Sequence, residues 1–327
     1  MRAESKDAAR YDRRVGTEPR LSVVMVTGDC RERAQHALDR LCAQTALDEI
    51  EIVVVDLGSK GTLSAPAGAP VEILAEPDIE HWAEARRIGL TRSSGPVVAF
   101  VEEHCFTDPH WAERLIAAHE GPWASVGYGF LNANPETYVS RAAMVTDYGL
   151  WLDPAQRGPT AFLPGNNVSY KREALMSLGD RLDGALASDF VAHEAFRERG
   201  LPMFVEPSAL ASHMNFTTVW ETGWTNYVWC RAMAAQRADA AGWSRARRVG
   251  QGVLTPASAP VFRVARLART LRQRRPLWRP FAASLPVLVA VSLFAACGEA
   301  TGYLRGPGRA EAQLKRWELD VERVPVA

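Results

Sequence analysis

The stretch Pro96-Val-Val-Ala-Phe-Val-Glu-Glu-His104 decides how the fold of this chain is interpreted. Residues 96–101 form a nearly continuous apolar run, the pattern of a strand that is buried on both faces. Glu102, Glu103 and His104 follow at its carboxyl end, and each can hold a cation or a proton. Open α/β sheets bind ligands at the carboxyl ends of their strands. The stretch therefore predicts a buried strand that ends at a ligand site, the alternative being a solvated strand end before a loop.

Strand and helix patterns alternate along the first half of the chain. Apolar runs at 21–27, 50–55 and 71–75 predict three strands before the one at 96–101, and residues 81–91 read as a helix. This alternation predicts parallel βαβ units in a doubly wound α/β sheet. The first strand is not followed by G-x-G-x-x-G, and the chain has no G-x-x-x-x-G-K-[ST]. A dinucleotide-binding Rossmann domain and a P-loop are therefore disfavoured.

Length and charge predict one large domain with a basic appendage. The 327 residues exceed a typical single domain. Lys and Arg number 38, as do Asp and Glu, so net charge identifies no partner. Residues 241–280, however, contain ten Arg and no acidic residue. A basic run beside an apolar segment points to an anionic membrane surface rather than to nucleic acid.

Cysteine spacing and the first residues bear on the compartment. The five cysteines are scattered and lack C-x-x-C spacing, which predicts free thiols in a reducing compartment. The first twenty residues are charged and contain no apolar core of a signal peptide. We expect residues 1–19 to be a flexible N-terminal extension.

Several motifs, in order along the chain, resemble those of family 2 glycosyltransferases, which have the GT-A fold. They are Leu21–Thr27, Ala43-Gln-Thr45, Glu51–Ser59, Ala85–Leu90, Phe100–His104, Thr107–Trp111 and Leu163–Leu175. The resemblance covers roughly residues 20 to 215, and an ordered set is more specific than any one motif. It implies a GT-A-like, mainly parallel doubly wound sheet flanked by helices, over residues 20–235. It also implies a hexosyltransferase that uses a nucleotide diphosphate sugar and inverts the anomeric centre.

The resemblance implies a cation site in which the family's D-x-D motif is replaced. Glu102-Glu103-His104 occupies that position, and His213 stands where many GT-A enzymes have a metal-contacting histidine. Glu102, His104 and His213 are therefore the expected ligands of a divalent cation, Mn²⁺ or Mg²⁺. Imidazole is a softer ligand than the carboxylate pair that Mg²⁺ prefers, so the replacement leaves open whether a metal is required.

Further roles follow from the same resemblance. Asp189 matches the residue that supplies the general base, and Asp56 matches the one that contacts the nucleotide. The expected donor-binding residues are Thr27, Asp29, Asp56, Arg86, Arg87 and Glu102, and the expected acceptor residues are Gly165, Asn166 and Asn167. Arg86 or Arg87 could also supply positive charge in place of a cation. Structural alternatives are a helix cap for Asp189, a turn for Asp56 and a capping box with Glu32 for Asp29.

The C-terminal third is expected to be a basic amphipathic and apolar helical region, residues 236–327, that associates with a membrane. Residues 281–297 carry no charge, but 17 residues are at the short limit for a span of about 20. A single span, an in-plane hairpin and a buried pair of core helices all stay open. Trp220, Trp224 and Tyr227 recur at helical spacing and predict one helix face, for packing or for a membrane interface.

These features together predict a glycosyltransferase at the cytoplasmic face of the cell membrane. Its acceptor would be a lipid-linked molecule or a polysaccharide of the cell envelope, and no nucleic acid partner is expected. One alternative is a non-catalytic GT-A-like binding protein. The other, a nucleotidyltransferase, is less favoured because the first strand lacks a following G-G-x-G-T-R loop. The residues do not define the donor sugar, its nucleotide, the acceptor or the oligomeric state.

Overall fold

The structure is a computed structural model that describes residues 18–272 and 274–323. Most of the extension predicted at 1–19 lies outside these residues. The chain divides into two compact units, which are described separately. The first comprises the residues up to Gly129 together with Gln156–Ala211, and the second comprises Phe130–Ala155 and the residues from Ser212 onward. The boundary predicted between 235 and 236 falls inside a helix, α8 (Val219–Ala240).

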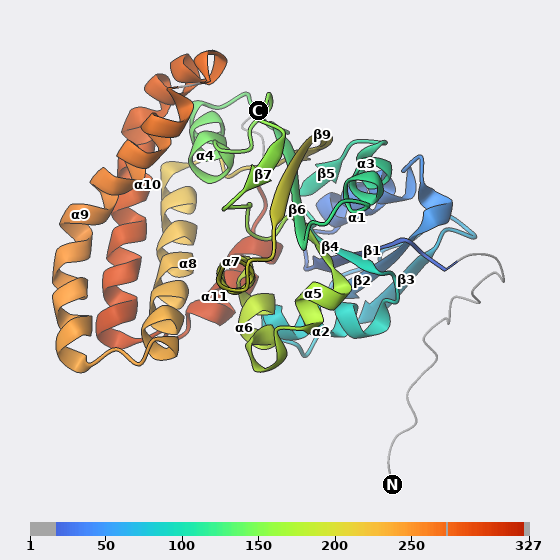
Figure 1. Ribbon diagram of the computed structural model, residues 1–327, viewed down its shortest axis with the longest axis horizontal. Coiled ribbons are helices and arrows are strands. Elements are labelled where there is room, and N and C mark those ends of the chain that lie inside the picture. The colour runs from blue at the N-terminus through green and yellow to red at the C-terminus, as the bar shows by residue number, and fades with distance from the viewer. Residues whose placement is uncertain (1–17, 273, 324–327) are drawn as a thin grey trace, which may run out of the picture. The chain divides into compact units, whose positions relative to one another are not determined.

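A mixed sheet of nine strands forms the centre of the fold, in the order β3-β2-β1-β4-β8-β6-β9-β5, with β7 paired to β9 (Figure 1). The strands are β1 (Leu21–Thr27), β2 (Ile50–Asp56), β3 (Val71–Ala75), β4 (Val97–Glu102), β5 (Cys105–Thr107), β6 (Ser125–Asn132), β7 (Gly158–Thr160), β8 (Val168–Lys171) and β9 (Met203–His213). The first four strands are parallel and match the four apolar runs of the sequence. Beyond β4, strand β8 pairs antiparallel with β4 and β6, and β7 pairs antiparallel with β9. The predicted α/β class is confirmed, with antiparallel strands added on one side.

Helices cover the parallel strands on both faces, as a doubly wound sheet requires. They are α1 (Arg31–Cys42), α2 (Trp82–Arg92), α3 (Trp111–Ala118), α5 (Arg172–Met176), α6 (Leu182–Ala187) and α7 (Asp189–Glu198). In Figure 1, α1 and α3 lie on one face of the sheet and α2 on the other. All residues of β1 and β4 are buried, which agrees with their continuous apolar runs. Gly89 lets α2 approach β1, since a Cβ there would lie 2.3 Å from Val24.

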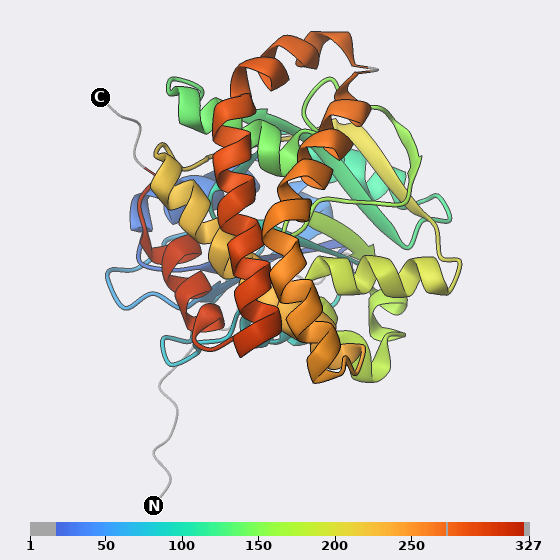
Figure 2. The ribbon, with the colours of Figure 1, turned by 90° about the vertical axis from the view of Figure 1, so that its left-hand side faces the viewer.

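The second unit is helical. Its helices are α4 (Tyr138–Tyr148), α8, α9 (Arg245–Leu271), α10 (Arg275–Arg305) and α11 (Ala310–Lys315). The long helices α8, α9 and α10 run side by side, and α10 contacts both of the others and α4 (Figure 1 and Figure 2). Gly298 and Gly302 form a G-x-x-x-G pair, at which a Cβ would lie 2.1 and 2.3 Å from backbone oxygens of α8. These glycines therefore bring the two backbones into contact.

Aromatic and apolar residues of this unit follow the sequence expectation. Trp220 stacks on Trp224 at 5.6 Å between ring centroids, and Trp224 stacks on Tyr227 at 5.0 Å, so the three share one face of α8. Among the described residues, α10 is the one helix long and apolar enough to cross a membrane. Half of its most apolar 18-residue window is buried inside the protein, as in the core helix of a soluble protein. It is therefore only a weak sign of membrane association.

Candidate active site

The register of the parallel strands brings three predicted donor-site residues to one edge of the sheet. Thr27, the last residue of β1, is the partner of Asp56, and Val26 is the partner of Glu102. Thr27, Asp56 and Glu102 are all buried. These residues cluster because the parallel strands β1, β2 and β4 end at the same edge of the sheet.

Asp56 is held by a dense set of donors. Arg31 donates two hydrogen bonds to its carboxylate, at 2.8 and 2.9 Å. The hydroxyl of Thr27 donates to Oδ1 at 3.1 Å, and the backbone N–H of Gly58 donates to the same oxygen at 3.0 Å. Three of these four bonds go to Oδ1, and one, from Arg31, goes to Oδ2. A carboxylate oxygen has about two acceptor positions, so Oδ2 retains capacity for a further donor while Arg31 stays in place.

Asp29 does not cap the first helix as expected. The N-cap of α1 is Cys30, without a side-chain hydrogen bond. Asp29 Oδ1 instead accepts from the backbone N–H groups of Ser59 and Lys60, at 2.7 and 3.1 Å. Burial raises the pKa of this carboxyl, but these two N–H groups outweigh it and hold the pKa below its usual value. Asp29 thus joins the turn after β1 to the loop after β2.

Glu103 has different partners from the other two residues of its motif. Its carboxylate is fully buried and accepts from the backbone N–H of Gly28 at 2.9 Å and from Arg33. Replacing one partner of such a buried pair leaves an uncompensated charge, which typically costs about 3–5 kcal/mol. Glu103 therefore fixes the turn that begins α1.

Glu102 is joined to the segment predicted to lie on the acceptor side. Asn166 Nδ2 donates to Glu102 Oε1 at 2.8 Å, and the side-chain amide of Asn167 donates to the other oxygen. The backbone N–H of Glu102 in turn donates to Asn167 Oδ1 at 3.0 Å. Asn166 has a φ of 67°, a left-handed conformation that Asn tolerates better than most residues. Gly165 precedes this turn. Two of the predicted acceptor residues thus contact a predicted cation ligand.

Asp189, the predicted base, is the first residue of α7 and is 2% exposed. Tyr170 donates its hydroxyl to Oδ1 at 2.6 Å. Arg86 donates to Oδ2 at 3.0 Å, and the backbone N–H of Asn166 donates to the same oxygen at 2.7 Å. Burial raises the pKa of Asp189, but the charge of Arg86, that of nearby His193 and these hydrogen bonds outweigh it and lower the pKa. The carboxylate is therefore ionised at neutral pH.

The two arginines predicted on α2 have different surroundings. Arg86 is 1% exposed and lies over the ring of Phe100, 4.7 Å from its centroid. Besides Asp189, its guanidinium donates to the backbone oxygens of Leu186 and Asn166 at 3.3 and 3.2 Å. Arg87 is half-exposed and pairs with Asp183. Adjacent helix residues point about 100° apart, so they serve different faces.

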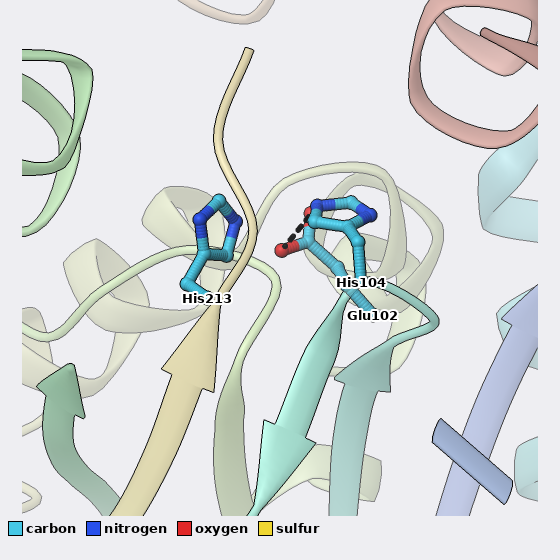
Figure 3. Close-up of side chains that lie close together, drawn as sticks. All are labelled: Glu102, His104 and His213. Atoms are coloured by element: carbon cyan, nitrogen blue, oxygen red, sulfur yellow. Dashed lines mark ion pairs between the residues drawn. The ribbon is translucent and has the colours of Figure 1, made fainter. Parts of the chain in front are cut away.

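Glu102, His104 and His213 form a group that could hold a divalent cation (Figure 3). One ligand atom from each residue lies within 4.8 Å of the others, and all three side chains are buried. His104 Nε2 is 3.3 Å from Glu102 Oε2, and His213 is the last residue of β9. Its Nδ1 is 3.0 Å from Asn215 Oδ1. One carboxylate and two imidazoles suit Mn²⁺ or Zn²⁺ better than Mg²⁺, so the residues fit a cation.

Sequence reasoning missed the residues that hold this site. Arg31, Arg33 and Tyr170 each bind a carboxylate that lies many residues away in the chain. Arginines are frequent in this chain, and their spacing does not reveal a partner. The only sequence signal was the position of Arg31 in the turn after β1, where ligand-binding loops of α/β sheets lie.

Comparison with known proteins agrees with the α/β fold. Residues 22–179, just under half of the chain, match the model of glycosyl transferase family 2. The match includes the ends of β1, β2 and β4 and the Asn166–Asn167 segment. Asp189 and His213 lie beyond the matched residues.

Curated relatives match shorter parts of their own chains. Validoxylamine A glucosyltransferase of Streptomyces hygroscopicus subsp. jinggangensis is 30% identical over 134 residues, or 37% of this chain and 32% of that protein. Glycosyltransferase AglE of Haloferax volcanii is 31% identical over 112 residues, or 32% of this chain and 37% of that protein. The alignments thus span about a third of the length of these relatives.

Among solved structures, a mannosyltransferase of Pyrobaculum calidifontis, in complex with GDP-Man and Mn²⁺, aligns with 94% of this chain. The alignment covers 89% of that protein, with a TM-score of 0.48 and 16% identity. At this distance no residue role is transferred.

Proposed function

We propose that the protein is a glycosyltransferase that moves a sugar from a nucleotide diphosphate sugar to an acceptor at a membrane. The observation that carries the proposal is the position of Glu102 and His104 at the carboxyl end of β4, beside Asp56 and Thr27 at the ends of the neighbouring strands. The match of residues 22–179 to the model of glycosyl transferase family 2 supports the same reaction. Asp56 and Thr27 would contact the nucleotide, and Asp29 would hold the loop that lies beside it.

A cation bound by Glu102, His104 and His213 would neutralise the diphosphate as it leaves. The rest of the reaction falls to the side chains of the protein. Asp189 would accept the proton of an acceptor hydroxyl while that oxygen forms its bond to the anomeric carbon, and the nucleoside diphosphate would depart from the opposite side. Such a displacement inverts the anomeric centre. Because the pKa of Asp189 is lowered, proton transfer would occur late, as the attacking oxygen becomes acidic.

The acceptor class is proposed from the helical unit. The apolar α10 and the basic run at 241–280 support an acceptor that is lipid-linked or a polysaccharide, met at the cytoplasmic face of a membrane. Gly165, Asn166 and Asn167 would lie on the acceptor side of the donor. The donor sugar is a hexose in this proposal.

A second function, binding without turnover, is favoured by one observation. The carboxylates of Asp56 and Asp189 each accept at least three hydrogen bonds, and both are engaged by an arginine. A protein that kept the fold but lost catalysis could retain this arrangement. The two functions differ in whether Asp189 is needed for anything besides stability.

The test is a panel of nucleotide diphosphate sugars, with and without Mn²⁺, measured for thermal stabilisation and for release of nucleoside diphosphate. Catalysis is supported if a donor that raises Tm is also consumed, because a ligand that binds only the native state stabilises it. A donor that raises Tm and is never consumed, with lipid-linked and glycan acceptors present, supports the non-catalytic function. If no donor binds, both functions are wrong.

A further inference from the structure

An open cavity of about 510 Å³ lies where α9 turns into α10, and its lining is strongly basic. It is lined by Arg272, Arg275, Pro276, Trp278 and Arg279. The three arginines are exposed. Within residues 18–272 and 274–323, none of their side chains has a hydrogen bond or an ion pair. The cavity thus gathers three guanidinium groups that no acidic residue neutralises.

Three unpaired guanidinium groups around one cavity fit a phosphate. Arginine presents a planar fork of N–H donors that matches phosphate oxygens, and charge-assisted bonds of this kind are the strong ones. Mutual repulsion of the three charges is relieved only when an anion binds among them. The cavity also lies at the first turn of α10, the positive end of the helix dipole, although Pro276 has no N–H there and the N–H of Leu277 is bonded to Arg274.

An exposed apolar face of α10 begins at this cavity. Trp278 is 41% exposed, and Val289 and Leu293 are 43% and 47% exposed. With the exposed Ala282 and Pro286 between them, these residues recur every three or four positions and share one face of the helix. The face extends over residues 278–293, or about 22 Å along the helix axis. A phosphate in the cavity would therefore lie beside a surface suited to hydrocarbon.

The neighbouring helix argues against a vertical insertion of this face. Leu267 and Leu271 of α9 pack with Phe281 and Leu288 of α10, so the end of α9 lies beside the uncharged part of α10. That end also carries the exposed Arg266, Arg269 and Arg272. If α10 spanned a bilayer, these arginines would lie in hydrocarbon, at several kcal/mol each. In the plane of the interface, they would lie among headgroups.

We propose that the cavity at the α9–α10 turn binds the phosphate of an anionic phospholipid, with the apolar face of α10 lying in the membrane surface. The inference rests on the proposed membrane association and names the site and the lipid chemistry that produce it. A lipid phosphate is the ligand, rather than free phosphate, because the cavity continues into the exposed apolar face.

The test is flotation of the full chain with vesicles of phosphatidylcholine alone or mixed with phosphatidylglycerol. Wild-type protein should float only with the anionic vesicles. A basic residue near such a surface contributes about 1 kcal/mol, or about five-fold in affinity. The triple variant Arg272→Gln/Arg275→Gln/Arg279→Gln should therefore bind about a hundred-fold more weakly. These side chains are exposed, so its Tm should match that of wild type.

The matched control removes three exposed arginines from the other end of the helix pair. Arg245 is 27 residues from Arg272 along α9, or about 40 Å, well beyond the screening length of about 10 Å. The variant Arg245→Gln/Arg305→Gln/Arg309→Gln should lose less vesicle binding than the first triple variant, because its arginines lie outside the cavity even though the in-plane helices can bring them near lipid. Equal loss in the two triple variants would show diffuse attraction and overturn the site. Unchanged binding of the first triple variant would also overturn it.

Two further measurements separate the ligand and the underlying function. Titration calorimetry with inorganic phosphate, at constant ionic strength, should give no binding to wild type. Tight binding would make free phosphate the ligand and overturn the lipid assignment.

Donor binding should be equal in wild type and the first triple variant. Loss of vesicle binding in that variant, with donor binding intact, supports the inference. Absence of donor binding in both proteins would contradict the glycosyltransferase proposal. The vesicle measurements would still test the lipid site in that case.

Discussion

Asn166 Nδ2 donates a hydrogen bond to Glu102 Oε1 at 2.8 Å. The backbone N–H of the same asparagine donates to Asp189 at 2.7 Å. A single residue therefore touches both the predicted cation ligand and the predicted base, from a turn with φ of 67°. Displacement of Asn166 is expected to disturb both of them.

Replacing Asn166 by glycine separates its side chain from its backbone. Glycine adopts a positive φ without strain, so Asn166→Gly should keep the turn and the hydrogen bond to Asp189. Loss of the amide should free Glu102 and weaken Mn²⁺ binding several-fold, measured by titration calorimetry. Asn166→Ala should also lower the free energy of unfolding by about 1 kcal/mol more than the glycine variant, because of backbone strain. Equal Mn²⁺ affinity in wild type and Asn166→Gly would show that this amide does not position Glu102.

The role of Asp189 can be tested through its neighbour Tyr170. The hydroxyl of Tyr170 is among the groups that lower the pKa of Asp189, so Tyr170→Phe should raise that pKa. If Asp189 is the base, the acidic limb of the pH–rate profile should move to higher pH in the variant. A limb that stays in place would remove the base assignment. Asp189→Asn should abolish turnover, but it also leaves Arg86 buried without its counter-ion, at a cost of about 3–5 kcal/mol in stability.

Glu51 provides a test of acid stability at the other end of β2. Its carboxylate accepts from Ser22 Oγ at 2.8 Å and from the N–H of Gly95 at 3.0 Å. Burial raises the pKa of Glu51, but bonds from Ser94, Ser22 and Gly95 outweigh it and lower the pKa. A depressed folded-state pKa gives stability that is present above the unfolded value of about 4.3 and lost as pH falls through the lower folded value.

Glu51→Gln should therefore lower the free energy of unfolding by about 1 kcal/mol at pH 7 and by less at pH 3. Urea titrations of wild type and variant at the two pH values measure this difference. A difference in unfolding free energy between the two proteins that is larger at pH 3 than at pH 7 would contradict the lowered pKa of Glu51.

The contact between α8 and α10 depends on the absence of side chains at Gly298 and Gly302. Gly298→Ala would bring a Cβ to 2.1 Å from the backbone oxygen of Tyr227. The helices must separate, so the variant should be destabilised by about 1–3 kcal/mol. Gly250 of α9 has no atom within 4 Å of its Cβ position, and Gly250→Ala should stabilise by up to about 1 kcal/mol. Thermal unfolding should move the two variants in opposite directions; a stable Gly298→Ala protein would rule out close contact there.

Local patterns were sufficient for the parallel half of the sheet. The runs at 21–27 and 71–75 became β1 and β3 with the same bounds, because strands buried on both faces are uniformly apolar. The antiparallel pairing of the other half was not predicted. There Val97 pairs with Lys171, and short strands that pair over such distances leave little periodicity to recognise.

The sequence identified several residues of the candidate site but not the contacts between them. Asp56 and Glu102 were found because strand ends can be recognised from sequence. Their partners Arg31 and Asn166 lie 25 and 64 residues away, and sequence alone does not pair them. The expected cap by Asp29 was wrong because N–H groups of the loop after β2, absent from any local pattern, compete for its carboxylate.

The most direct test of a donor site at the ends of β1, β2 and β4 is calorimetric titration of nucleotide diphosphate sugars, with Mn²⁺, into wild type and two variants. Asp56→Asn changes the carboxyl end of β2, whereas Glu51→Gln changes a hydrogen-bonded carboxylate at the amino end of the same strand. At least one donor should bind wild type and Glu51→Gln alike and bind Asp56→Asn at least about ten-fold more weakly, a loss of about 1.4 kcal/mol. Equal affinity in all three proteins, or no binding of any donor to wild type, would contradict the site.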